Sequence, residues 1–398
     1  MLASEAVRRI ESRHCRPSET RTVADPRPPV ETLSSIESVD PLSWDRLFDA
    51  GHNPCVSHAF LHALEAAGCV GDHCGWTPQH QIIRDDHGGL IAAAPVYLKT
   101  HSRGEFVFDW AWADALERAG HAYYPKLVCG VPFTPVPGPR IAGQPDGVER
   151  ILDALRAQCA RGEASSVHVL FPTTAPTADD QWLERRDLRY VWSNDGYADF
   201  DGFLAELTSK RRKTIRRERR RLGEQGIHFT TRLADDLDAT HWQAVHALYA
   251  RTYLIRGQRP YLTPEFFPAY AALAPGRVLL IEAHLDDRLL AVAIAIVGDD
   301  TLFGRHWGTA IDVDGLHFET CYYQGIEYCI EHRLTRYDAG VQGEQKRMRG
   351  FEPFITRSLH HIAHPGLRRA VNAFLAEERR AVADWAESAE EHSAFRRV

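Results

Sequence analysis

The feature that most constrains this chain is a pattern of strands and turns that occurs twice. Residues 80–112 alternate as strand, polar turn, apolar strand, turn and a third strand with an aromatic end, and residues 278–308 repeat that order. In each half, helical segments precede the three strands, and another helix and strand follow them. The repetition predicts an α+β fold in which each half forms a mixed, mostly antiparallel sheet flanked by helices. Trp110 or Trp112 of the first unit then corresponds to Trp307 of the second.

The two ends of the chain differ from these units. Residues 1–31 are rich in charge and proline and lack apolar periodicity, so a disordered tail is expected there. Residues 363–398 carry an apolar stripe between charged residues, which predicts a C-terminal amphipathic helix. The expected division is therefore a tail, a first domain over 32–196, a second over 197–362 that includes a basic helix at 209–226, and the C-terminal helix.

Composition excludes several functional classes. A net charge of −7 gives no general signature of a DNA-binding protein. No apolar run reaches the roughly 20 residues that a membrane helix needs, so we expect a cytoplasmic protein without a membrane span. The eight cysteines form no C-x-x-C pair, and the two short groups of His and Cys residues, at 55–62 and 69–74, lack the spacing of zinc modules. We therefore expect reduced thiols and no metal.

One segment after the third strand of the second unit matches a phosphate-binding pattern. Residues 305–310, RHWGTA, fit the R-x-x-G-x-A form of the loop by which many members of the GNAT acyltransferase superfamily hold the pyrophosphate of coenzyme A. However, the sequence IDVDG separates this loop from a helix expected to begin near Leu316. Gly308 therefore cannot lie at the N-terminus of that helix, and the spacing argues against a standard coenzyme A loop.

The longer stretch over residues 305–353 resembles the FemABX-like branch of that superfamily. Its parts are Trp307-Gly308, an aromatic-rich helix, a strand ending in Tyr-Asp-Ala-Gly at 337–340, and a basic Gly-Phe element at 346–351. More closely, the chain is similar to the FemAB-like, peptidoglycan biosynthesis/recognition family from about residue 35 to 380. The resemblance implies two tandem GNAT-like domains.

The same resemblance implies a function. It is the transfer of an acyl or aminoacyl group to an amine of a small molecule or peptide, with a role related to the cell wall. Acyl-coenzyme A or aminoacyl-tRNA would be the co-substrate, without a tightly bound cofactor, and tRNA would then be a partner. The alternative is a non-catalytic module that binds peptidoglycan or RNA. The oligomeric state stays open.

The glycine-punctuated polar segment at 342–351, together with the end of the strand before it, is the expected site of transfer. Asp338 or Glu344 could accept the proton of the attacking amine, and Lys346 or Arg349 could hold a carboxylate or phosphate. Strand periodicity places Asp338 on the opposite face from its neighbour Tyr337. The remaining substrate-binding candidates here are Trp307, Gly308 and Gln342. An ion-paired surface loop is the other interpretation.

Two further groups of residues are candidates for binding. Trp110 and Trp112 lie on one face of the third predicted strand, as either core residues or an aromatic wall for a substrate, and Lys126 after them could hold an anion. Nine of the twelve residues from 210 to 221 are Lys or Arg. Arg212, Arg216 and Arg220 are the proposed phosphate ligands; a solvated helix whose charges pair with acids elsewhere is equally compatible with this run.

Overall fold

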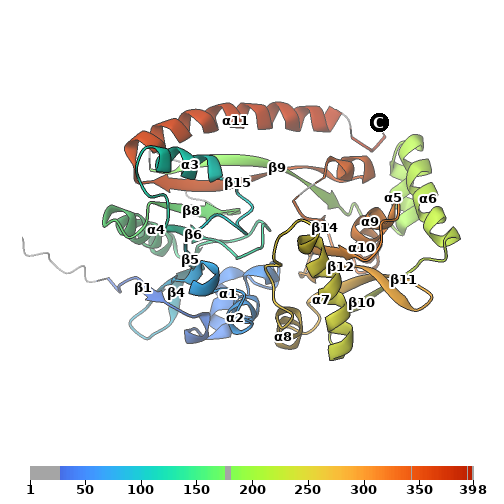
Figure 1. Ribbon diagram of the computed structural model, residues 1–398, viewed down its shortest axis with the longest axis horizontal. Helices are drawn as coiled ribbons and strands as arrows, with labels where there is room; N and C mark the ends of the chain where they lie inside the picture. Colours follow the sequence, from blue (N-terminus) through green and yellow to red (C-terminus); the bar gives the residue numbers. More distant parts are fainter. Residues whose placement is uncertain (1–26, 175–180, 342, 392, 397–398) are drawn as a thin grey trace, which may run out of the picture.

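The computed structural model describes residues 27–174, 181–341, 343–391 and 393–396 (Figure 1). It contains a four-stranded sheet of order β1-β3-β4-β7 and an eleven-stranded sheet of order β10-β11-β12-β13-β14-β9-β15-β8-β6-β5-β2. Helices cover these sheets, so the predicted α+β class with mixed sheets is confirmed. Among the described residues, no helix combines the length and apolar character needed to cross a membrane.

The second half contains the clearer of the two predicted strand units. Strands β11, β12 and β13 are antiparallel neighbours, and β14 then pairs parallel to β13 after a helical crossover. The elements are α5 (Phe200–Glu206), α6 (Ser209–Glu224), β10 (His228–Leu233), α7 (Ala239–Leu254), α8 (Phe266–Leu273), β11 (Val278–Leu285), β12 (Arg288–Val297), β13 (Thr301–Thr309), α9 (Leu316–Phe318), the π-helix η4 (Glu319–Tyr323), α10 (Gln324–Glu331), β14 (Arg336–Asp338), the 3-10 helix η5 (Glu344–Arg349), β15 (Glu352–Ile362) and α11 (Pro365–Glu391).

Both faces of this sheet are buried, which explains why β12 is apolar almost throughout. Val292 and Ile294 pack with Leu248 of α7 on one face, and Ala293 packs with Tyr322 of η4 on the other. A strand covered by helices on both sides loses the alternation of polar and apolar residues that a half-exposed strand shows.

The first half follows the same order, with a small second sheet. Strands β3 and β4 pair in the four-stranded sheet, β5 and β6 pair in the large one, and β8 then lies parallel to β6 after the crossover helix α4. The elements are β1 (Glu31–Leu33), η1 (Ile36–Ser38), α1 (Pro41–Phe48), η2 (Pro54–Val56), α2 (His58–Ala66), η3 (Asp72–Cys74), β2 (Trp76–Pro78), β3 (His80–Arg84), β4 (Leu90–Ala94), β5 (Val96–Lys99), α3 (Trp110–Arg118), β6 (Lys126–Cys129), β7 (Ala142–Gly143), α4 (Pro145–Ala160), β8 (Ser166–Leu170) and β9 (Leu183–Ser193).

The third strand of the first unit was assigned to the wrong segment. Residues 110–118 form helix α3, and the strand that occupies this place is β6 at Lys126–Cys129. The expected match of Trp110 or Trp112 with Trp307 therefore fails, because Trp307 lies on β13, whose counterpart is β6. The aromatic residues favour a strand locally, but the segment WAWADALERA at 110–119 that contains them consists mostly of good helix formers.

Two long strands join the halves into one sheet. β9 pairs with β14 of the second half, and β15 pairs with β8 of the first, while β9 and β15 pair with each other over nine positions. In Figure 1, α11 runs along the top over both strands and across both halves. Each half thus supplies one strand to its counterpart. The domain boundaries at 32, 197 and 363 stay predictions.

Candidate functional site

The candidate site lies where strands β13 and β14 separate. The two strands pair only from Thr301 to Phe303 against Arg336 to Asp338. Beyond that point they diverge around a cleft of about 360 Å³, which we call the divergence cleft. In the part of the chain that the structure describes, no strand pairs with the edge of β13 that faces β14 beyond Phe303, so backbone N–H and C=O groups line the opening.

Several aromatic side chains contribute to the wall of this cleft. Trp307 of β13 and Tyr337 of β14 line it from the strands, and His317, Phe318 and Tyr322 line it from the helical segment α9–η4. The ring of His317 makes edge contacts with Trp307 at 5.3 Å and with Tyr322 at 5.3 Å between ring centroids. The surroundings thus suit a flat or apolar group, with the strand backbone as the main polar surface.

His317 is a residue that the sequence analysis missed. Burial, together with the nearby charges of Lys346 and Arg349, lowers the pKa of its imidazole to about 4, so the ring is neutral at pH 7. A neutral imidazole can accept a proton. The one available signal was its position as the second residue of the helix that begins at Leu316, which the sequence did predict.

Gly308 has a packing role. A Cβ atom there would lie 2.2 Å from the backbone carbonyl of Leu248 in α7, so only glycine lets that helix approach β13 so closely. The following residues reach α9 through a separate turn, and α9 begins at Leu316. Gly308 therefore does not lie at a helix N-terminus, in agreement with the spacing argument, and Trp307 is the member of the pair that lines the cleft.

The polar segment forms a short 3-10 helix, η5, beside the cleft. Lys346 is almost fully buried, and its ammonium donates a hydrogen bond to the carbonyl oxygen of Gly340. Burial lowers the pKa of Lys346 to about 8, and the charge of Arg189 contributes, although the carboxylate of Asp338 opposes the shift. A positive φ of 89° at Gly340 turns the chain away from β14 and brings the loop back over it.

Arg349 anchors the basic helix to the site. Its guanidinium donates to Glu218 Oε1 of α6 at 2.9 Å and to the hydroxyl of Tyr323 at 2.7 Å, and its Cζ lies 3.4 Å from the ring centroid of Phe318. Because these protein groups already satisfy it, Arg349 positions Phe318 at the cleft wall. Its assignment as a substrate ligand stays a prediction.

Asp338 lies on the opposite face of the sheet from the divergence cleft. Its neighbour Tyr337 lines that cleft, whereas Asp338 lines a second pocket of about 320 Å³ between the two halves, which we call the junction pocket. One oxygen of Asp338 accepts a hydrogen bond from the N–H of Gly340 at 2.9 Å, and the other lies 3.7 Å from Arg189. Strand alternation predicted this separation of faces correctly.

The two remaining candidates of the polar segment are not placed. Gln342 lies outside the described residues. Glu344 begins η5, but its side chain lies outside what the structure describes. The role of Glu344 as proton acceptor therefore stays a prediction.

Lys126 and the two tryptophans before it lie in different surroundings. Lys126 is fully buried and donates to Ser102 Oγ at 2.8 Å and to Glu105 Oε2 at 2.7 Å, with a further bond to Asp109. We therefore assign Lys126 a structural role in place of the predicted binding role. Trp112 is 5% exposed and packs against α11, whereas Trp110 is 53% exposed on α3. The two do not share a face, because helical periodicity separates them.

On the basic helix α6, the three predicted phosphate ligands make contacts within the protein, and their phosphate-binding role stays a prediction. Arg212 donates to backbone carbonyls, Arg216 pairs with Asp201 at 2.7 Å, and Arg220 pairs with Glu224 at 3.4 Å. Four other bases are exposed and have no hydrogen-bond or ion-pair partner among the residues that the structure describes. They are Lys210, Lys213, Arg217 and Arg221, whose spacing of three, four and four residues puts them in one stripe along the helix.

Comparison with solved structures returns distant matches. FemX matches at 11% identity, covering 76% of this chain and 92% of that protein, with a TM-score of 0.46. L-PGS from Bacillus licheniformis matches at 9% identity, covering 79% and 93%, with a TM-score of 0.48. A tandem GNAT protein from the clavulanic acid biosynthesis pathway matches at 11% identity, covering 84% and 98%, with a TM-score of 0.44. Likenesses at this distance assign no activity.

The family comparison is more extensive. No curated protein matches the chain. The model of the FemAB-like family, described as peptidoglycan biosynthesis/recognition, matches residues 35–397, which include both halves of the sheet and the divergence cleft. The chain therefore belongs to the FemAB-like family of peptidoglycan biosynthesis or recognition.

Proposed function

We propose that this protein is an acyltransferase that joins an acyl or aminoacyl group to an amine in the divergence cleft. The observation that carries the proposal is the short pairing of β13 and β14, which ends after three residues and leaves an open backbone edge inside an aromatic cleft. Free backbone N–H groups can polarise an acyl carbonyl, and neighbouring aromatic walls exclude water from it. Membership of a peptidoglycan biosynthesis/recognition family supports a peptide or cell-wall precursor as the acceptor.

The transfer requires one bond to form and one to break. The neutral amine nitrogen attacks the acyl carbonyl carbon, the C–N bond forms, and the C–O or C–S bond to the donor breaks. The amine loses a proton to a base, and the leaving oxygen or sulfur gains one. Glu344 is the proposed base, and His317 is a second candidate because its neutral ring lines the cleft. Asp338, the alternative base of the sequence analysis, lines the junction pocket on the other face of the sheet and would serve only a substrate that reaches that pocket.

The donor is proposed to carry phosphate groups. The stripe of Lys210, Lys213, Arg217 and Arg221 supports this, because four unpaired bases along one helix face attract a polyanion. Both acyl-coenzyme A and aminoacyl-tRNA meet this condition.

Mass spectrometry of molecules that co-purify with the protein tests the function, followed by an assay for a new amide with each donor class and an amine-bearing peptide precursor. A product that appears only with the protein and one donor supports the proposal. Tight retention of peptidoglycan fragments or RNA, without any amide formed from either donor, would instead establish the binding-module alternative.

The stripe makes a prediction of its own. Reversing Lys210, Lys213 and Arg217 to Glu should abolish the binding of bulk tRNA in a filter-binding assay, since each base that contacts a phosphate releases a counterion. The parent's log–log dependence of affinity on salt should be steeper by about one unit for each of these contacts. Arg220→Glu is the matched control, because the guanidinium of Arg220 already forms an ion pair with Glu224. A parent whose affinity does not change with salt contradicts the prediction.

A further inference from the structure

Arg189, which the sequence did not single out, is a buried cation with unused hydrogen-bond donors. It lies in β9, is 1% exposed, and its guanidinium carbon is 4.7 Å from the ring centroid of Phe171. Its Nη1 is 3.7 Å from Asp338 Oδ2. Within the described part of the chain, neither Nε nor Nη2 of Arg189 has a hydrogen-bond partner. Buried donors without partners are rare, because each costs the free energy of its lost hydration.

The two unused donors belong to one edge of the guanidinium. Nε–H and one Nη–H of arginine point in parallel, and this edge matches the two oxygens of a carboxylate in a bidentate pair. The Asp338 carboxylate approaches from Nη1, so it leaves that edge free. The vacant edge therefore has the geometry of a carboxylate site.

The charge around Arg189 is also unbalanced. Lys346 and Arg305 both interact electrostatically with Asp338, as does Arg189, so three cations share one buried carboxylate. Asp187 is the other acid near Arg189, but it is exposed and its carboxylate accepts a hydrogen bond from the N–H of Leu188. Such an excess of buried positive charge favours the entry of an anion.

The junction pocket is lined by three residues that adjoin Arg189, although Arg189 itself lies behind them. One of them is Asp338, the ion-pair partner of Arg189. The second is Val191, which follows Arg189 by two residues and so lies on the same face of β9. The third is Phe354, which lies directly opposite Arg189 on β15. Asn53 also lines the pocket, and its buried Oδ1 has no hydrogen-bond partner among the described residues. The pocket thus offers an unused acceptor in addition to the unused edge of the arginine.

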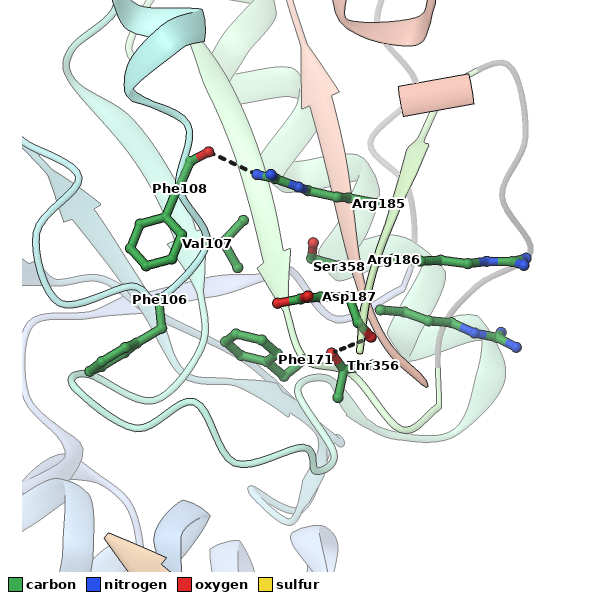
Figure 2. A pocket seen from close by; sticks show the side chains of 10 residues that line it. Phe106, Val107, Phe108, Phe171, Arg185, Arg186, Asp187, Thr356 and Ser358 are labelled. Atoms are coloured by element: carbon green, nitrogen blue, oxygen red, sulfur yellow. Dashed lines mark hydrogen bonds between the residues drawn. The ribbon is translucent and has the colours of Figure 1, made fainter. Parts of the chain in front are cut away.

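A second pocket near Arg189 is much smaller, with a volume of about 30 Å³. Figure 2 shows Phe171, Thr356 and Asp187 among the residues that line it. Phe171, whose ring stacks against Arg189, separates the arginine from this space. A volume of this size holds water and excludes an organic ligand. The junction pocket, at about 320 Å³, is therefore the space near Arg189 that can hold one.

We propose that Arg189 binds the carboxylate of a ligand that occupies the junction pocket, with Nε and Nη2 each donating to one carboxylate oxygen. Asn53 Oδ1 accepts a hydrogen bond from an N–H group of the same ligand. The ligand class is therefore an amino-acid or peptide terminus that carries a carboxylate near an N–H. This inference rests on the proposed acyl transfer only where it identifies that ligand with a substrate; carboxylate binding itself is independent of any transfer.

Ligand-detected NMR with the full chain tests the proposal. The probes are N-acetylglycine, which carries a carboxylate and an N–H, and N-acetylglycinamide, which lacks the carboxylate. The parent should bind the acid at least about tenfold more tightly than the amide, since a bidentate charged pair exceeds a neutral contact by this factor or more. Equal binding of the two probes, or none of the acid, overturns the proposal without requiring any variant.

Variants locate the carboxylate. Arg189→Met should lose the preference for the acid, and Arg189→Lys should retain part of it, because lysine keeps the charge without the bidentate edge. Arg185→Met is the matched control: Arg185 lies on the same face of β9, and Glu378 occupies its guanidinium at 2.7 and 2.9 Å. Retention of the preference in a folded Arg189→Met protein contradicts the assignment.

A third probe, inorganic phosphate, separates the two kinds of anion. Tighter Arg189-dependent binding of phosphate than of N-acetylglycine overturns the carboxylate assignment. The NMR experiments contain no acyl donor, so a failed transfer assay would not change their interpretation. Conversely, if the protein is an active transferase but its ligand binding does not depend on Arg189, only the carboxylate-site inference is wrong.

Discussion

Lys126→Met should lower the free energy of unfolding by about 3–5 kcal/mol, because it leaves two carboxylates buried without their main cation. The ammonium of Lys126 bonds Glu105 and Asp109 where both side chains are at most 2% exposed. Lys99 stays near Glu105, with Nζ 3.9 Å from Oε1, so compensation in the variant is partial. Chemical denaturation monitored by circular dichroism measures the change.

The pH dependence provides a second readout of the same cluster. Burial alone would raise the pKa of Asp109, but the charge and hydrogen bond of Lys126, with other nearby groups, hold that pKa below its usual range. A carboxylate with a lowered folded-state pKa contributes stability above its unfolded pKa and loses it as the pH falls through the folded value. In Lys126→Met the pKa of Asp109 should rise, so acid unfolding should begin at a higher pH than in the parent.

A surface pair of the same region supplies the control. Arg118 lies 3.6 Å from Asp114 on α3, and the two side chains are 75% and 70% exposed. Arg118→Met should change the unfolding free energy by less than about 0.5 kcal/mol. If Lys126→Met is also within this range, the cluster does not stabilise the fold as described, and a substrate-binding role for Lys126 would return.

Glu344→Gln should reduce turnover by roughly a hundredfold or more if Glu344 accepts the proton of the attacking amine. Stability should stay within about 0.5 kcal/mol of the parent, since a residue beside the cleft contributes little to the core. Steady-state kinetics with the identified donor and acceptor measures the loss. Lys346→Ala should lower stability, because the buried ammonium of Lys346 donates to the carbonyl oxygen of Gly340. If Lys346 also holds a substrate charge, the variant should raise the Michaelis constant of that substrate more than it lowers turnover.

Two other variants distinguish the candidate bases. Asp338→Asn removes the carboxylate that three cations share, so it should destabilise the protein by about 3 kcal/mol whether or not it affects chemistry. His317→Gln replaces the neutral ring at the cleft wall by a side chain that cannot accept the proton. Full activity in Glu344→Gln with strong loss in His317→Gln moves the base to His317. Full activity in all three would show that catalysis depends on positioning alone.

Local sequence periodicity determined several parts of this protein. The run of bases at 210–221 marked the basic helix, and the local sequence marked the start of the helix at Leu316. The opposite orientation of Tyr337 and Asp338 follows from the period of 2 within a strand. The α+β class was also predicted from local patterns, because the order of predicted strands and helices repeats along the sequence. Each of these properties depends on neighbours within a few residues, which the sequence displays directly.

The tertiary structure decided what these elements meet. Lys126 meets carboxylates 17 and 21 residues away, and Arg189 meets Asp338 across the junction of two halves. The exchange of β9 and β15 creates that junction, and strand pairing between distant segments leaves no signature in either segment alone. The segment that contains Trp110 and Trp112 also could not be assigned from local sequence alone. Its aromatic residues favour a strand, but the segment folds as a helix that buries Trp112 against α11. Local pattern therefore set which face a side chain takes, and long-range contacts alone set whether that face carries a core, an ion pair or a binding site.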